Sequence, residues 1–221
     1  MAGVQSIGSE SKAYQTNGYV LFERLFPPIV LAVFHGKLQK DLNLKADPAF
    51  VSNTPLLTKP ALEVYSRHYV PMATFHWGLT PTAAGIAGCQ LIPTYAYFRV
   101  YQKDDVCLVH ADRAACEHSM SLTLELADDK RWALCVAKQY ADVHAPSADP
   151  SFRPDEAFTE LPMLAGDAVM YRGVNHRHGR IEPNPNRWSA HLFLHWVDAN
   201  GPFADQAFDR PAVEAAKAQA R

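Results

Sequence analysis

Alternation of polar and apolar residues marks the middle of the chain as β-structure. Between residues 119 and 126, serine, threonine and glutamate alternate with methionine and leucine, which is the period-two pattern of a strand with one buried face. Further strands are expected where short apolar or aromatic runs end at turn residues. Those runs lie at residues 18–22, 95–101, 106–110, 132–136, 168–171 and 188–197.

Helical patterns lie nearer the two ends of the chain. The two prolines at residues 27–28 fit the first turn of a helix, and the apolar residues of 29–42 share one broad helical face. A second helix is expected over residues 60–70, and a terminal helix over residues 208–221. These helices would pack on the outside of the strands.

Short strands that follow an N-terminal helical region predict a β-sandwich or jelly roll with helices outside it, a mainly β fold of the α+β class. We find no internal repeat or linker that divides the chain. We therefore expect a loose polar segment at residues 1–14, a single domain at 15–200, and a helical C-terminal tail at 201–221. Within the domain, residues 141–161 are rich in Pro, Ala, Ser and Asp and are expected to form a loop.

The composition, with 48% hydrophobic and 20% charged residues, is that of a globular protein. The formal net charge of -2 provides no long-range attraction to nucleic acid or to a membrane surface, so a small-molecule partner is favoured. No secretory pattern opens the chain and no apolar run approaches the roughly 20 residues that cross a bilayer, so we expect a cytoplasmic protein. The four cysteines form no C-x-x-C pair and are expected to be buried thiols.

Candidate metal ligands lie on the predicted strands. Because residues two apart on a strand share a face, His110 and Asp112 can point into a barrel together. Two imidazoles and one carboxylate on one side of an iron ion leave coordination positions open, and the distant His178 can supply the second imidazole. This pattern predicts an iron site with room for other ligands.

A line of polar residues on the last predicted strand also needs partners. Arg187, Ser189, His191, Phe193 and His195 share one face of this strand. Buried polar groups are costly unless they form hydrogen bonds. A bound dicarboxylate would satisfy them, because an arginine fork can bind a carboxylate through two hydrogen bonds and a serine hydroxyl can add a third.

Together these residues resemble the pattern of the Fe(II)- and 2-oxoglutarate-dependent dioxygenases, which have a His-x-Asp, a distal His, and a basic residue beyond it that is often part of Arg-x-Ser. The resemblance extends over roughly residues 15–198, and within that superfamily the chain is similar to a bacterial branch. The segments that carry it are Arg99-Val100-Tyr101, His110-Ala111-Asp112-Arg113, Cys116-Glu117, Gly166-Asp167, Tyr171-Arg172-Gly173, His178-Gly179-Arg180 and Arg187-Trp188-Ser189.

The resemblance implies a double-stranded β-helix, a jelly-roll barrel with the N-terminal helices outside, and an enzyme that uses Fe(II), 2-oxoglutarate and O2. It implies His110, Asp112 and His178 as the metal-binding and catalytic residues. The implied reaction is hydroxylation of an unactivated C–H bond in a small molecule, with desaturation and cyclisation left open. Halogenating members have a small residue where Asp112 stands, so no halogenation is expected.

The resemblance also implies residues that bind the cosubstrate. Arg187, assisted by Ser189, would anchor the distal carboxylate of 2-oxoglutarate, and Tyr101 lies where related enzymes often place a tyrosine near that carboxylate. The substrate is expected to be a small molecule, with amino-acid-like compounds among the candidates. The residues expected to select it are Tyr95, Tyr97, Arg99, Arg113, Glu117, Trp132 and the loop at 141–161.

Two alternatives remain at this point. His176 could be the third ligand in place of His178. The set His176, His178 and Glu182 also resembles half of a cupin metal motif, which would predict a metal- or ligand-binding barrel without 2-oxoglutarate turnover. The remaining histidines are expected to be structural or to line the pocket.

Overall fold

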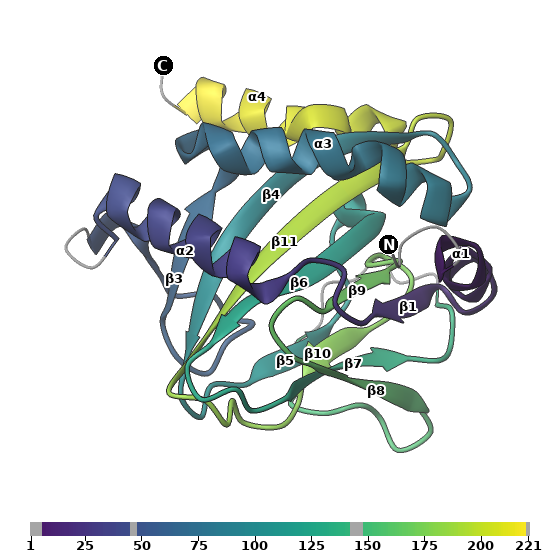
Figure 1. Cartoon of the computed structure of the whole chain (residues 1–221). Coiled ribbons are helices and arrows are strands. Elements are labelled where there is room, and N and C mark those ends of the chain that lie inside the picture. Colours follow the sequence, from purple (N-terminus) through teal and green to yellow (C-terminus); the bar gives the residue numbers. More distant parts are fainter. Residues whose placement is uncertain (1–5, 45–47, 142–147, 220–221) are drawn as a thin grey trace.

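The structure is a computed structural model that describes residues 6–44, 48–141 and 148–219. Its strands form two antiparallel sheets, which lie as two layers in Figure 1. The larger sheet has the order β1 (Tyr19–Phe22), β9 (Ala168–Tyr171), β6 (His118–Leu126), β11 (Trp188–Asp198), β4 (Leu91–Gln102), β3 (Ala61–Tyr65) and β2 (Val51–Ser52). The smaller has the order β5 (Cys107–His110), β10 (His178–Arg180), β7 (Trp132–Ala137) and β8 (Phe158–Met163).

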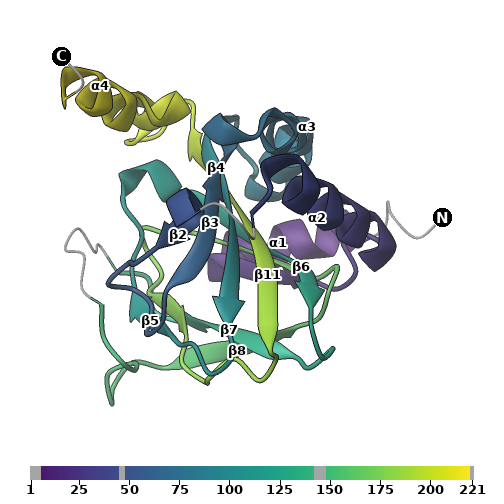
Figure 2. The same cartoon turned by 90° about the vertical axis from the view of Figure 1, so that its left-hand side faces the viewer.

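The helices α1 (Ser6–Asn17), α2 (Pro28–Leu42) and α3 (Val70–Ala87) pack on the outer side of the larger sheet, as Figures 1 and 2 show. The C-terminal helix α4 (Arg210–Gln219) is exposed and projects away from the sheet in Figure 2. Leu38 of α2 and Met72 of α3 are fully buried in the main apolar core, which these helices share with the sheet. The predicted fold class, a mainly β jelly roll with helices packed outside it, is confirmed.

The period-two pattern separates the two faces of the larger sheet. On β6, Met120, Leu122 and Leu124 belong to the core beneath the helices. The intervening Ser119 and Ser121 are also fully buried, but their hydroxyls bond to polar side chains between the sheets. One face of the sheet therefore stabilises the fold, and the other carries polar chemistry into the space between the layers.

The prediction of a helix over residues 60–70 is wrong. Residues 61–65 form β3, which pairs with β4 through register partners such as Leu62 with Val100 and Val64 with Phe98. The helix α3 begins only at Val70 and continues to Ala87. Pairing with a long neighbouring strand thus overrides a local pattern that is compatible with a helix.

The segment expected to be loose at residues 1–14 is a helix from Ser6 onward; residues 1–5 lie outside the described residues. Tyr14 is fully buried, and its hydroxyl lies 2.7 Å from Nδ1 of His118 on β6. This contact joins α1 to the sheet and explains why a polar segment is ordered.

The loop expected at residues 141–161 ends earlier than predicted, because β8 begins at Phe158 and pairs with β7. Residues 142–147 of that loop lie outside the described residues. The short strand β10 was not expected, although it positions the site described below. In the described part of the chain, no helix is long and apolar enough to cross a membrane.

Candidate metal centre

Three of the predicted ligands meet between the two sheets. His110 ends β5 and His178 begins β10, and the two residues lie opposite each other in the antiparallel pairing of these strands. Their Nε2 atoms lie 3.6 and 3.5 Å from Oδ1 of Asp112. These separations are too long for good hydrogen bonds, so the three groups surround a common point without saturating one another.

The two imidazoles are oriented for metal binding by backbone hydrogen bonds. Nδ1 of His110 lies 2.7 Å from the carbonyl oxygen of Leu108, and Nδ1 of His178 lies 2.8 Å from that of His176. A carbonyl oxygen only accepts, so each Nδ1 carries the proton and donates it. The Nε2 lone pairs are therefore left free toward Asp112, which is how bound histidines are commonly held in metal sites.

Asp112 lies beyond the end of β5 and is fixed by other contacts. Its backbone N–H donates to the carbonyl oxygen of Gly173 at 2.9 Å, and its Oδ2 accepts a hydrogen bond from Ser119 at 3.1 Å. Burial alone would raise the pKa of the Asp112 carboxyl, but attraction to His178 and His110 in their protonated form outweighs burial and holds that pKa well below its ordinary value. Asp112 is therefore a carboxylate, as a metal ligand requires.

A second group, Asp112, Cys116 and His195, also places possible ligand atoms close together. Burial raises the pKa of the Cys116 thiol well above its ordinary value, and the sulfur lies 3.1 Å from the Tyr95 hydroxyl. A protonated thiol is a poor metal ligand because the thiolate is the binding form. The arrangement with two histidines therefore fits a divalent ion better.

His176 and Glu182 lie outside this cluster. Nδ1 of His176 is 2.8 Å from the carbonyl oxygen of Ala137. Its Nε2 packs so closely against Gly18 that a side chain at position 18 would clash with the imidazole ring. Glu182 is exposed. The structure therefore brings His178, and neither His176 nor Glu182, to Asp112.

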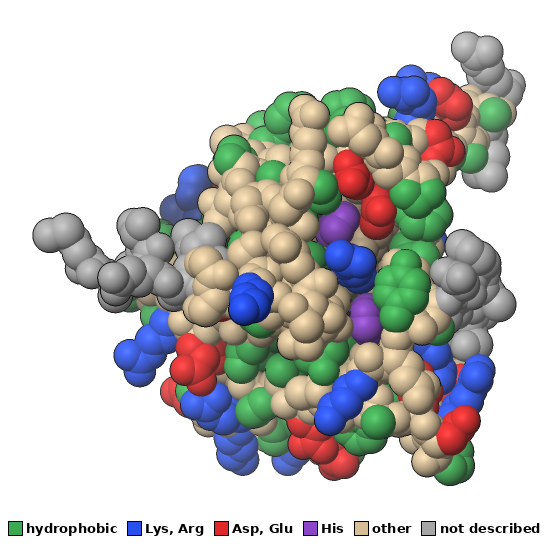
Figure 3. All heavy atoms as spheres, turned by 90° about the vertical axis from the view of Figure 1, so that its right-hand side faces the viewer, with side chains coloured by type: hydrophobic (Ala, Val, Ile, Leu, Met, Phe, Trp, Pro, Cys, Tyr) green, Lys and Arg blue, Asp and Glu red, His purple; other side chains and the backbone are tan. Residues whose placement is uncertain are grey.

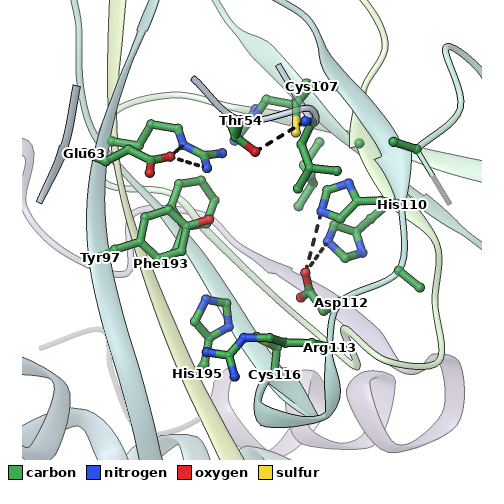
Figure 4. A pocket seen from close by; sticks show the side chains of 18 of the residues that line it. Thr54, Glu63, Tyr97, Cys107, His110, Asp112, Arg113, Cys116, Phe193 and His195 are labelled. Atoms are coloured by element: carbon green, nitrogen blue, oxygen red, sulfur yellow. Dashed lines mark hydrogen bonds and ion pairs between the residues drawn. The ribbon is translucent and has the colours of Figure 1, made fainter. Parts of the chain in front are cut away.

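The cluster opens into a cavity of about 580 Å3 between the sheets. Figure 4 shows His110 and Asp112 on one side of it, across from Tyr97, Phe193 and Glu63. Tyr97 stacks on Phe193 with ring centroids 4.7 Å apart. Nε of Arg99 donates to Glu63 at 2.6 Å, which forms a buried ion pair in the cavity wall.

The arrangement of the strands matches solved enzymes. The chain is similar to SnoK, a non-heme alpha ketoglutarate dependent carbocyclase from nogalamycin biosynthesis, with 14% identity, coverage of 86% of this chain and 83% of that one, and a TM-score of 0.68. It is also similar to HygX from Streptomyces hygroscopicus, solved with nickel, 2-oxoglutarate and hygromycin B (10% identity, 87% of each chain, TM-score 0.64). A Pseudomonas putida prolyl-4-hydroxylase matches at 13% identity over 86% of this chain and 98% of that one, with a TM-score of 0.57.

The chain has the fold of the non-heme 2-oxoglutarate oxygenases. This confirms, for the fold, the resemblance seen in the sequence. No protein-family model and no curated protein sequence matches the chain.

Arg187 does not reach the cavity of this 2-oxoglutarate oxygenase fold, so the expectation that it faces inward with Ser189 needs correction. Its side chain is 71% exposed, and Nε donates to Oδ1 of Asp128 at 2.8 Å. The backbone N–H of Arg187 donates to the other oxygen of the same carboxylate at 2.7 Å. Asp128, in the turn after β6, thus holds the residue outside the sheet just before β11 begins.

Ser189 does face inward, but its hydroxyl is already bound to Oδ1 of Asn184 at 2.8 Å. Tyr101 lines the cavity and is almost fully buried. Its oxygen accepts a hydrogen bond from Arg99 at 3.1 Å, which leaves its own O–H to donate. Of the three residues expected to bind 2-oxoglutarate, the structure places Tyr101 alone in the cavity wall.

Sequence reasoning missed two polar residues of the site. Ser119 links the centre to β11, because its hydroxyl lies 2.8 Å from Nδ1 of His195 as well as 3.1 Å from Asp112. Arg180 is 1% exposed and lines the cavity from β10. A signal for Arg180 was present: it lies two residues after His178 and so shares its face.

Proposed function

We propose that this protein is an Fe(II)- and 2-oxoglutarate-dependent oxygenase acting on a small molecule. The observation that carries the proposal is the convergence of the free Nε2 atoms of His110 and His178 on the ionised Asp112 at one wall of the cavity. Two imidazoles and one carboxylate on one side of an ion are the ligand set of non-heme iron oxygenases. The similarity of the fold to that of a non-heme alpha ketoglutarate dependent enzyme supports the same function.

Each ligand has a distinct task in this proposal. His110 and His178 would bind the ion through Nε2 while their Nδ1 protons stay on backbone carbonyls, so neither ring can rotate without losing a hydrogen bond. Asp112 would supply one negative charge against a divalent ion, with Ser119 holding its second oxygen. Iron with 2-oxoglutarate and O2 would supply the oxidising power for attack on a C–H bond.

The cavity wall favours a small substrate with both apolar and polar parts. Tyr97 and Phe193 form an apolar surface opposite the ligands, which would exclude water from the reacting C–H bond. The Glu63 and Arg99 pair beside them offers an acceptor and a donor to polar groups. We propose hydroxylation as the outcome, with desaturation and cyclisation as the other outcomes of the same chemistry.

The charges on one face of the molecule give no support for a nucleic-acid partner. On the face that carries α1 and β1, acidic and basic side chains are interspersed and form no field of one sign (Figure 3). Such a surface, with a formal net charge of -2, does not favour nucleic acid.

The test is formation of succinate from 2-oxoglutarate by the purified protein with Fe(II) and O2, in the presence of a panel of small metabolites. We expect succinate to depend on Fe(II) and to increase with at least one class of substrate. Asp112→Ala should abolish it, whereas Glu182→Gln, at an exposed residue of the alternative cupin-like set, should retain it. Metal binding without 2-oxoglutarate consumption would instead support a non-catalytic barrel.

A further inference from the structure

The cavity contains a buried arginine that has no acidic partner among the described residues. Three arginines are buried in the described residues: Arg99, Arg177 and Arg180. Arg99 is paired with Glu63, and Arg177 with Asp149 and Glu156. Arg180 forms no ion pair with any described residue, although it is the most deeply buried of the three. A buried charge without a counter-charge is unfavourable unless a ligand supplies one.

The groups around the Arg180 guanidinium are all neutral. Nη1 donates to the carbonyl oxygen of Trp132 at 2.7 Å, and the indole ring of Trp132 lies beneath the guanidinium at 4.7 Å. Nη2 lies 3.4 Å from the Ser121 hydroxyl and from Nδ1 of His191, and 3.5 Å from the Met163 sulfur. Burial lowers the pKa of His191 well below its ordinary value, so that this ring is also neutral. These contacts orient the guanidinium but are weak at Nη2, and none compensates its charge.

The position of Arg180 suits a ligand that also reaches the metal. His178 and Arg180 are alternate residues of β10, so both side chains face the cavity, at a spacing of about 6.6 Å along the strand. Gly179 between them lies against the backbone of β5, where a side chain would clash with the carbonyl oxygen of Cys107. A five-carbon dicarboxylate spans a distance of this order.

Other cations of the cavity wall are already neutralised. Arg99 is held by Glu63, and Arg113 by Asp209 at 2.8 Å. Tyr101, which also lines the cavity, has a free O–H and packs edge-on against Trp132 with centroids 5.0 Å apart. Arg180 and Tyr101 are thus joined through Trp132 at one end of the cavity.

We propose that Arg180 on β10, in place of Arg187, binds the distal carboxylate of 2-oxoglutarate, and that the Tyr101 hydroxyl donates to the same group. The inference rests on the proposed oxygenase function. It moves the carboxylate anchor from the start of β11 to the strand that carries His178. The exposed Arg187 then has a structural role in holding the turn at Asp128.

The experiment measures binding without turnover. The protein is loaded with Mn(II) under anaerobic conditions, and binding of 2-oxoglutarate and of 2-oxopentanoate, which keeps the 2-oxo acid but lacks the distal carboxylate, is followed by calorimetry. The wild type should bind 2-oxoglutarate at least about 100-fold more tightly, as expected for two hydrogen bonds to a charged group. Arg180→Gln should lose most of that preference, and the matched variant Arg187→Gln should keep it.

A merely structural role for Arg180 would weaken both ligands together and would leave their ratio unchanged, which would overturn the proposal. Retention of the preference by Arg180→Gln with its loss in Arg187→Gln would also overturn it. If Arg180→Gln does not fold, Arg180→Lys takes its place and should bind 2-oxoglutarate more weakly than Arg187→Gln does; the opposite order contradicts the inference. Failure of the wild type to bind 2-oxoglutarate at all would refute the proposed function itself, and the inference with it.

Discussion

Gly173 lies so close to Asp112 that any side chain at position 173 would clash with the Asp112 carboxylate. The carbonyl oxygen of the same glycine accepts the Asp112 backbone N–H at 2.9 Å. Position 173 thus positions Asp112 in two ways: its carbonyl oxygen binds the Asp112 backbone N–H, and the absence of a Cβ leaves room for the carboxylate. The loop after β9 thereby determines where the acidic ligand can stand.

Gly173→Ala should therefore displace Asp112 and weaken metal binding. The added methyl group would also contact the Cys116 carbonyl oxygen and the Ser119 hydroxyl, so we expect a loss of about 1–3 kcal/mol in the free energy of unfolding. Calorimetric titration with Mn(II) and urea denaturation measure the two effects. The control is Gly78→Ala in α3, where a Cβ meets nothing within 4 Å and should stabilise the helix by up to about 1 kcal/mol. Unchanged Mn(II) affinity in Gly173→Ala would contradict the proposed role of Asp112.

Ser119→Ala should lower metal affinity with little change in fold. The variant removes the hydrogen bond to Oδ2 of Asp112 and the link to Nδ1 of His195. Loss of such a supporting contact typically weakens a metal site by about 10–100-fold. Titration with Mn(II) measures it, and a circular dichroism melt tests the fold. If affinity were retained, the Ser119 contact would have no part in holding the ligand.

Glu63→Gln should destabilise the protein by about 3–5 kcal/mol, because it leaves the buried Arg99 without its counter-charge. Urea denaturation gives the free energy of unfolding. The comparison is Asp41→Asn, which breaks the exposed pair of Asp41 with Lys37 on α2 and should change stability far less. Equal effects of the two substitutions would mean that burial of the Glu63 and Arg99 pair is not important.

Stability should fall in mild acid because of buried histidines away from the metal centre. Burial lowers the pKa of His76 to about 3 and that of His118 to about 4, from an ordinary value of 6.5. Between these values and 6.5 the unfolded chain binds more protons than the folded one, so stability is present above pH 6.5 and is lost as the pH falls toward 4. Each histidine contributes a slope of up to about 1.4 kcal/mol per pH unit.

Urea denaturation at a series of pH values measures that slope. His118→Gln keeps an acceptor for the Tyr14 hydroxyl but cannot be protonated, so its slope should be smaller than that of the wild type. His68→Gln changes an exposed histidine and should leave the slope unchanged. A slope in His118→Gln equal to that of the wild type would contradict this origin of the acid sensitivity.

Much of the fold could be predicted because alternation is a local signal. Polar and apolar residues alternate along β6 and, except at Phe193, along most of β11, so their two faces could be assigned from the sequence alone. The strand β3 could not be recognised, because it depends on its pairing with β4 and is followed at once by a helical segment. α1 was missed because a few contacts, such as that of Tyr14 with His118, order an otherwise polar segment.

The candidate site, like the fold, could be predicted from the sequence only in part. His110, Asp112 and His178 were predicted from type and spacing, and the structure brings them together. The prediction for Arg187 extended the period-two pattern one residue beyond the start of β11, where the backbone already turns to Asp128. Spacing along a sequence cannot reveal which arginine has a carboxylate partner, and that property separates Arg187 from Arg180.

The most direct test of the central claim is the visible absorption of the protein with Fe(II) and 2-oxoglutarate in the absence of O2. Chelation of 2-oxoglutarate to the bound iron should give a weak charge-transfer band. We expect the band in the wild type and in His176→Ala, whose imidazole faces Ala137 and Gly18, and its loss in His178→Ala. Absence of the band from the wild type, or its persistence in His178→Ala with loss in His176→Ala, would contradict the account.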